Sequence, residues 1–143
     1  MRLVIQRVSS ASVDVEGRRI SEIDTGLVVL VGIGQDDTEQ EVKATAQKVV
    51  KLRIFPDGEG KMNLSVADID GQVLVVSQFT LFGDTSRGNR PSFVSAAAPG
   101  AAEPLVGVFA EEIRSSGIAT SEGIFGKAME VALVNQGPVT III

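Results

Sequence analysis

Four residue types are missing from the sequence: histidine, cysteine, tryptophan and tyrosine. Without histidine and cysteine, the chain cannot build a Ser-His-Asp triad, a Cys-His nucleophile pair or the usual structural zinc sites. Catalytic groups must then come from Asp, Glu, Lys, Arg, Ser, Thr, the N-terminal amine or the backbone. The sequence also offers no convincing cluster of carboxylates. We therefore expect no metal and no other cofactor, and backbone groups become candidates for chemistry.

Long apolar runs are also absent. The longest runs, such as 73–76 and 141–143, have the length of strands, whereas a membrane span needs about 18 to 20 apolar residues. The first seven residues, MRLVIQR, lack the apolar core and cleavage site of a signal peptide. The lack of cysteine gives no sign of an oxidising compartment. We expect a cytoplasmic protein with no membrane partner.

Positive charge is in deficit. The chain has 13 Lys and Arg residues against 18 Asp and Glu residues, which gives a formal net charge of -5. Nucleic acids are normally bound by a basic surface, so the net charge alone argues mildly against an RNA partner. The length of 143 residues, with 44% hydrophobic residues, is typical of one folded domain with its own core. We expect a single domain over 1–143.

Strands dominate the predicted elements. Alternating apolar residues, continuous apolar runs and turn residues predict strands over 2–15 (one long or two short), 20–23, 27–33, 54–55, 72–82, 128–135 and 139–143. The dipeptide Asp70-Gly71 predicts a hairpin before the strand over 72–82. Gly32-Ile33-Gly34 superficially resembles a nucleotide-binding turn, but a third glycine is missing and a tight turn is the better interpretation.

Two helices are predicted between the strands. The spacing of Thr38 and Glu41 is that of a capping box, and it begins a helix over 38–51. A second helix covers 103–114, with Pro104 in its first turn. The long loop over 83–100 has the length of a functional loop. The pattern predicts an α+β fold, with a mixed, largely antiparallel sheet or partial barrel flanked by two helices.

The end of the chain predicts a partner. A bare edge strand over 140–143 would be an aggregation hazard, and pairing with a second copy of the chain would cover it. This pairing and the apolar composition predict a homodimer.

The segment Ser77-Gln78-Phe79-Thr80-Leu81 is a candidate site. Strand alternation would place polar side chains on both faces of an otherwise apolar strand. Burying each of them without a partner would cost about 1 to 3 kcal/mol. From spacing alone, a binding site and a satisfied strand end are both open interpretations.

A second candidate is Asn135-Gln136-Gly137-Pro138-Val139-Thr140. Its proline cannot donate to a ladder, although it lies between two strand-like runs, and the glycine before it permits unusual backbone angles. A simple turn is the alternative interpretation.

Together these two motifs resemble the paired signature of the D-aminoacyl-tRNA deacylases, the D-tyrosyl-tRNA deacylase type. Four further segments match in order and spacing, so that the resemblance covers essentially the whole chain: 1–8 (MRLVIQRV), 52–55 (LRIF), 61–64 (KMNL) and 90–93 (RPSF). Two separated motifs at matching distance are far more specific than either motif alone.

The resemblance implies hydrolysis of the ester between a D-amino acid, or glycine, and the 3′-terminal adenosine of tRNA, while L-aminoacyl-tRNA is rejected. It implies a homodimer in which Gly137 and Pro138 of one subunit form a cis element that reads chirality in the pocket of the other. The residues that this resemblance assigns to the site are Ser77, Gln78, Phe79 and Thr80 around the ester, Arg7 holding the Gly-Pro element, and Phe125 and Met129 near the adenine.

This activity fits the missing residue types. An aminoacyl ester is already activated, so positioning the ribose and directing backbone N–H groups at the developing oxyanion can suffice without a histidine base. Thr80 as a nucleophile is the alternative, although no base is evident to activate it. The acidic chain can act on tRNA if it holds only the acceptor end, through Arg87, Arg90, Lys61 or Lys127. A non-enzymatic small-ligand or protein-binding module on the same fold is the competing hypothesis.

Overall fold

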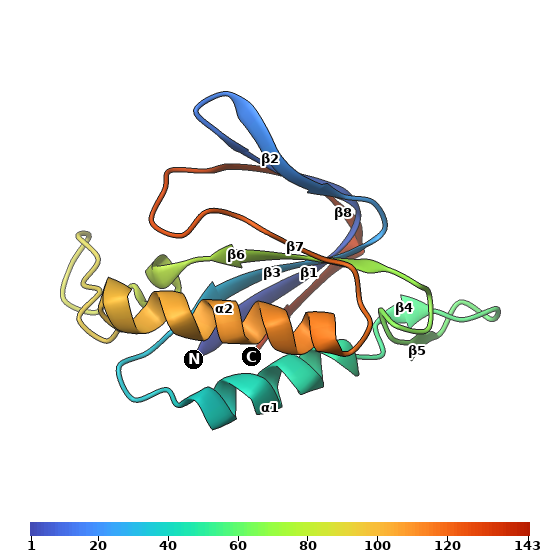
Figure 1. The fold of residues 1–143 in the computed structure, drawn as a ribbon, viewed down its shortest axis with the longest axis horizontal. Helices are drawn as coiled ribbons and strands as arrows, with labels where there is room; N and C mark the ends of the chain where they lie inside the picture. The colour runs from blue at the N-terminus through green and yellow to red at the C-terminus, as the bar shows by residue number, and fades with distance from the viewer.

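A computed structural model describes residues 1–143 as one mixed sheet with two helices packed side by side on one of its faces (Figure 1). The elements in chain order are β1 (Arg2–Val15), β2 (Arg18–Ile23), β3 (Gly26–Gly32), α1 (Glu39–Val50), β4 (Phe55–Pro56), β5 (Met62–Leu64), β6 (Gln72–Ser77), the 3-10 helix η1 (Phe79–Phe82), α2 (Pro99–Ser115), β7 (Thr120–Glu122) and β8 (Glu130–Ile142). The predicted α+β class is confirmed. Neither helix is long and apolar enough to cross a bilayer.

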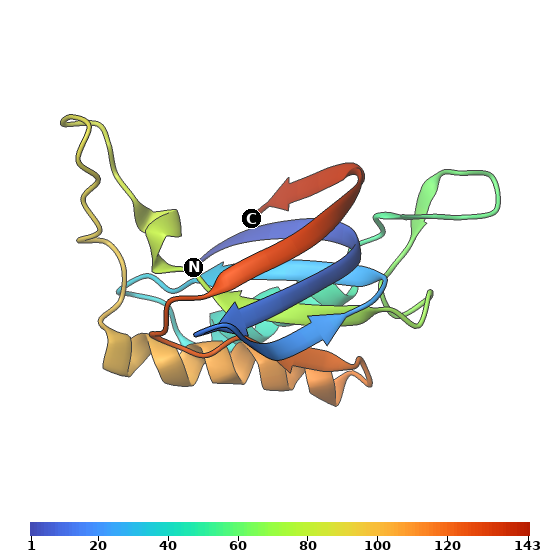
Figure 2. The ribbon, with the colours of Figure 1, turned by 90° about the horizontal axis from the view of Figure 1, so that it is seen from above.

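The strand β1 organises the sheet. It pairs in antiparallel fashion with β2, β3 and β8, while β3–β6 and β6–β7 are parallel. The sheet order is β2-β1-β3-β6-β7, and β8 joins β1 outside this path, so that the sheet curls toward closure (Figure 2). The parallel β3–β6 pairing fits the apolar run over 27–33, because a parallel strand is covered on both faces.

Each face of the sheet has its own core. The larger cluster of 22 buried residues fills the space between the sheet and the helices, with Phe55 and Phe109 among its largest side chains. A smaller cluster of eight buried residues, including Val8, Val28 and Leu74, lies on the other side, where β2 and β8 fold over. At about 25 cal/mol per Å² of apolar surface, this two-sided burial is the main stabilising term.

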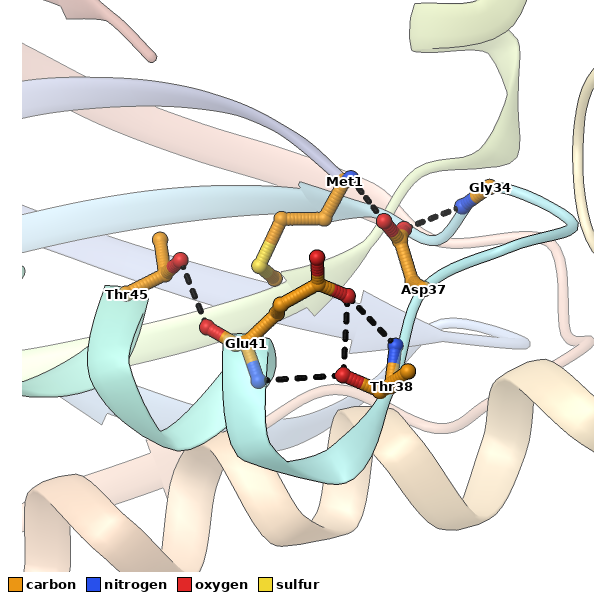
Figure 3. A network of polar contacts seen from close by, with 6 residues as sticks. All are labelled: Met1, Gly34, Asp37, Thr38, Glu41 and Thr45. Carbon is orange, nitrogen blue, oxygen red and sulfur yellow. Dashed lines mark hydrogen bonds and ion pairs between the residues drawn. The ribbon is translucent and has the colours of Figure 1, made fainter.

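The N-terminus of α1 has the predicted capping box (Figure 3). The Thr38 hydroxyl accepts a hydrogen bond from the Glu41 amide at 3.3 Å, and the Glu41 carboxylate accepts one from the Thr38 amide at 2.9 Å. These bonds hold the pKa of Glu41 below its usual value. Just before the helix, Asp37 accepts from the Gly34 amide at 2.6 Å and pairs with the amino group of Met1. The helix begins and ends at Glu39 and Val50, which confirms the prediction over 38–51.

The predicted strand over 72–82 is wrong in its second half. β6 ends at Ser77, and the chain turns into η1, whose Leu81 amide bonds to the Gln78 carbonyl. Gly32 and Gly34 make this turn possible, because a Cβ on either residue would come within 3.2 Å of the Phe82 ring. The two glycines that predicted a tight turn therefore give η1 room to pack on the end of β3.

Three other predictions need correction. Asp70-Gly71 forms no hairpin, because β6 pairs in parallel with strands distant in sequence. α2 begins at Pro99, which stands at the first helical positions, so Pro104 is the sixth residue rather than part of the first turn. Pro104 is exposed, and so is Gly100, whose carbonyl would otherwise accept from residue 104. The final two strands form one interrupted strand, β8.

Candidate active site

A pocket of about 630 Å³ opens at the end of β6, between η1, the first turns of α2 and the segment that leads into β8. Five of the nine predicted site residues line it: Ser77, Gln78, Phe79, Phe125 and Met129. Most of the lining is hydrophobic, and no Asp or Glu contributes to it. A second hollow of about 610 Å³ between β1, β2 and β8 is more polar and contains none of the predicted residues.

The motif 77–81 bends around the pocket rather than running straight along a strand. The Gln78 amide donates to the Val31 carbonyl at 2.7 Å, so it is already occupied by the sheet. The amides of Phe79 and Thr80 stand in the first turn of η1, where a helix supplies no acceptor. They are the two backbone donors of the motif that remain free for a bound group.

Thr80 faces Gln78 rather than a base. The Gln78 side-chain amide donates a hydrogen bond to the Thr80 hydroxyl oxygen. No carboxylate or amine of the chain is hydrogen-bonded to this hydroxyl. An alcohol without a base is a weak nucleophile at neutral pH, so the geometry favours a positioning role for Thr80.

Phe79 forms one wall of the pocket. Its ring is 57% exposed and meets the Phe93 ring edge-on, with centroids 5.1 Å apart. Phe93 comes from the long loop over 83–100, which folds back through an Asp84–Ser92 bridge and then pairs Ala96 with Gly34. Sequence reasoning did not single out Phe93 as a site residue, although it ends the segment 90–93.

Arg2 braces η1 from outside the pocket. Its Nη1 atom donates to the Leu81 carbonyl at 2.9 Å, and its guanidinium lies 4.7 Å from the centre of the Phe82 ring. Sequence reasoning missed this role as well. The only available signal was the position of Arg2 in the opening segment 1–8.

Phe125 and Met129 reach the pocket from the segment between β7 and β8. Phe125 packs against the larger core cluster and Met129 against the smaller one, so the two clusters hold this segment from both sides. A Cβ on Gly123 would lie 2.5 Å from the Met129 sulfur. Glycine at this position therefore lets Met129 turn in toward the pocket.

The remaining predicted residues, Arg7, Gly137 and Pro138, meet elsewhere. Only Arg7 separates Gln6 from Val8 on β1, whereas the four residues 136–139 separate their partners on β8. This bulge, the β8 bend, is held by Arg7, which donates from Nε to the Gln136 carbonyl at 2.9 Å and from Nη1 to the Ile54 carbonyl at 2.6 Å. The Gly137–Pro138 peptide bond is cis, as the resemblance implies.

The β8 bend is far from the pocket of its own chain. Arg7 pairs with Leu27 at one end of β3, whereas Val31 lines the pocket at the other end. Four residues of a strand span about 13 Å. β8 folds back on the side of the molecule away from η1 (Figure 2). Gly137 and Pro138 are exposed there, so they are free to contact a second copy of the chain.

Comparison with known proteins agrees with the two motifs. The family model described as D-Tyr-tRNA(Tyr) deacylase matches residues 4–143. The chain belongs to this deacylase family. It is 58% identical over 143 residues to the D-aminoacyl-tRNA deacylase of Roseiflexus castenholzii, covering all of this chain and 91% of that protein. It is 52% identical to the protein of the same name from Brevibacillus brevis, covering all of this chain and 99% of the other.

Two solved structures share the fold. A c-Myc DNA unwinding element binding protein has a TM-score of 0.93 and 40% identity, with 100% of this chain and 97% of that one covered. A probable eukaryotic D-amino acid tRNA deacylase has a TM-score of 0.84 over 99% of this chain and 97% of the other, at 17% identity. The resemblance first drawn from the motifs at 77–81 and 135–140 is confirmed for the family.

Proposed function

We propose that this chain is a hydrolase that cleaves the ester bond between a D-amino acid and the 3′-terminal adenosine of tRNA in the cytoplasm. The observation that carries the proposal is the convergence of the motif 77–81 with Phe125 and Met129 on one pocket, in a chain of the deacylase family. Water attacks the ester carbonyl carbon, and the bond from that carbon to the ribose oxygen breaks. The products are the free amino acid and tRNA with its terminal hydroxyl restored.

The backbone supplies the catalytic donors. The free amides of Phe79 and Thr80 stabilise the oxyanion that develops on the ester carbonyl oxygen. Fixing the ester and the ribose at this point lowers the barrier further, because the reacting groups no longer need to find one another. The 2′-hydroxyl of the substrate assists, so no side-chain base is required. Gln78 and Ser77 position the substrate from the end of β6.

Phe125 and Met129 hold the terminal adenine. An aromatic ring stacks on a base, and a thioether adapts to an aromatic face. Both side chains are half-buried and line the pocket. They fix the adenosine while the ester lies against the motif 77–81.

Rejection of L-amino acids requires a second copy of the chain. The exposed Gly137 and Pro138 of a partner subunit enter the pocket and contact the α-ammonium group and α-carbon of the substrate. A D side chain then points away from the protein, whereas an L side chain would collide with main chain, and glycine has nothing to collide. The apolar edge of β8 supports such a homodimer, since Val134 is 56% and Ile142 78% exposed.

The test compares glycyl-, D-alanyl- and L-alanyl-tRNA as substrates of the purified protein. Hydrolysis of the D and glycyl esters, with the L ester much slower, is the expected result. Comparable hydrolysis of the L and D esters would refute chiral rejection. Failure to hydrolyse any of the three would leave the non-enzymatic binding module as the better interpretation of the pocket.

A further inference from the structure

The pocket has one charged lining residue, Lys127, and nothing to neutralise it. Its ammonium forms no ion pair or hydrogen bond, and the lining contains no carboxylate. Elsewhere the chain pairs its exposed cations with acids, as Lys43 does with Glu39 at 2.6 Å and Lys61 with Glu59 at 2.7 Å. An unpaired cation at the mouth of an apolar pocket points to an anion that arrives with the ligand.

Two more unpaired cations lie on the opposite lip. Arg87 and Arg90 occupy the tip of the loop closed by the Asp84–Ser92 bridge, and neither makes a side-chain hydrogen bond or ion pair. The loop continues directly into Phe93, which lines the pocket. The carboxylate of Asp84 accepts from the Ser86 amide at 2.9 Å, so it is held within the turn.

The loop at 84–92 and the segment at 123–129 both lie at the η1 end of the molecule, on either side of the pocket mouth (Figure 1, Figure 2). Lys61, the fourth cation expected at the acceptor end, lies on the β4–β5 hairpin at the other end of the chain (Figure 1). It is paired with Glu59 and so does not belong to this group.

We propose that Arg87, Arg90 and Lys127 form a cationic rim that binds the phosphates of the unpaired nucleotides preceding the terminal adenosine. The inference rests on the proposed function and assigns the contacts that anchor the RNA strand outside the pocket. Guanidinium groups suit phosphate oxygens because they offer several N–H donors in one plane. A local rim also explains how a chain with a net charge of -5 holds a polyanion.

The experiment pairs two substrates with two variants. The substrates are D-alanyl-tRNA and the D-alanyl ester of adenosine, which has the same ester and base but no phosphate. The rim variant is Arg87→Gln/Arg90→Gln. The control is Lys48→Gln/Lys51→Gln on and just after α1, which removes the same charge from two unpaired cations away from the pocket.

The rim variant should lose about tenfold or more in kcat/KM on tRNA at low salt, and its logarithmic salt dependence should flatten by about 1. Its activity on the adenosine ester should equal that of the wild type, and the control should match the wild type on both substrates. Equal activity of the rim variant and wild type on tRNA would overturn the proposal, and so would an equal loss on both substrates.

A separate measurement keeps the rim testable if the proposed function fails. If the wild-type protein cleaves neither ester, binding of deacylated tRNA is compared between wild type and the rim variant. Weaker binding by the rim variant supports the rim. Unchanged binding overturns it, as does equally tight binding of a DNA duplex of similar length, which would point to a general polyanion surface.

Discussion

The Nε atom of Arg7 lies 2.9 Å from the main-chain oxygen of Gln136, a residue 129 positions away in the sequence. The same guanidinium donates to the Ile54 carbonyl at 2.6 Å, and the side chain is only 8% exposed. One buried cation thus fastens the β8 bend to β1 and to the residue before β4. The shape of the bend therefore depends on a side chain outside it.

Replacing Arg7 by lysine should destabilise the protein although the charge is kept. A single ammonium cannot reproduce the planar fork that reaches two carbonyls, and one buried acceptor is left unpaired. The free energy of unfolding should fall by about 2 kcal/mol, measured by urea denaturation. The exposed Arg18→Lys serves as the control and should be neutral. Equal denaturation midpoints for the Arg7 variant and wild type would contradict this.

Gly137→Ala should distort the β8 bend. Gly137 has φ +135°, and an added Cβ would lie 2.8 Å from Val139 Cγ2 and 2.9 Å from Arg7 Nη2. Strain of this kind costs about 1 to 3 kcal/mol, which a thermal melt would show as a lower midpoint. Gly58→Ala is the matched control, because nothing lies within 4 Å of a Cβ there. A melt of Gly137→Ala that overlays wild type would count against the close contact.

Gly123→Ala should act on the pocket through Met129. The new methyl group would occupy the place of the Met129 sulfur, 2.5 Å away, and would push that side chain from its position against the pocket. If Met129 holds the adenine, KM for the aminoacyl-tRNA rises several-fold with little change in kcat. Gly107→Ala on α2 provides the control, since no atom lies within 4 Å of its added Cβ. A selective fall in kcat would show that the substitution disturbs the reacting groups instead.

Acid should loosen the β4–β5 turn. Asp57 accepts hydrogen bonds from Asn63 Nδ2 at 2.6 Å and from the amides of Lys61 and Glu59 at 2.9 Å, which holds the pKa of Asp57 below its ordinary value. A lowered pKa in the folded state stabilises the fold above the unfolded pKa, and this stabilisation is lost as pH falls through the folded value.

Thermal midpoints of wild type should therefore drop below about pH 4, and Asp57→Asn should drop less over the same range. Between about pH 6 and 8 the midpoint should be flat, because the chain has no histidine side chain to titrate there. An Asp57→Asn variant with the same acid dependence as wild type would assign the loss to other carboxylates.

The elements that could be predicted from sequence are those whose periodicity matches a single local structure. The alternation over 2–15 and the capping box at Thr38 both lead to the observed β1 and α1. The strand over 72–82 failed after Ser77, because the turn into η1 depends on the space that Gly32 and Gly34 leave, and these lie about 45 positions earlier in the chain. Local patterns contain no record of that contact.

The site divides in the same way. The polar residues in the motif 77–81 marked the pocket correctly, since an apolar strand does not carry such side chains without reason. The contributions of Phe93 and Arg2 depend on how the loop and β1 fold against η1. The separation of Gly137 from the pocket of its own chain follows only from the register of β1 with β3 and β8.

The pairing of β1 with β8 has a consequence for how the protein is made. One long edge of β1 has no partner until β8 has been synthesised, more than 110 residues later. At translation rates of about 5 to 20 residues per second, that edge waits on the order of 10 s on the ribosome. During this time an alternating, partly apolar strand can pair with other nascent chains. We expect yield in overexpression to depend on chaperone supply and growth temperature more steeply than the stability of the finished fold would suggest.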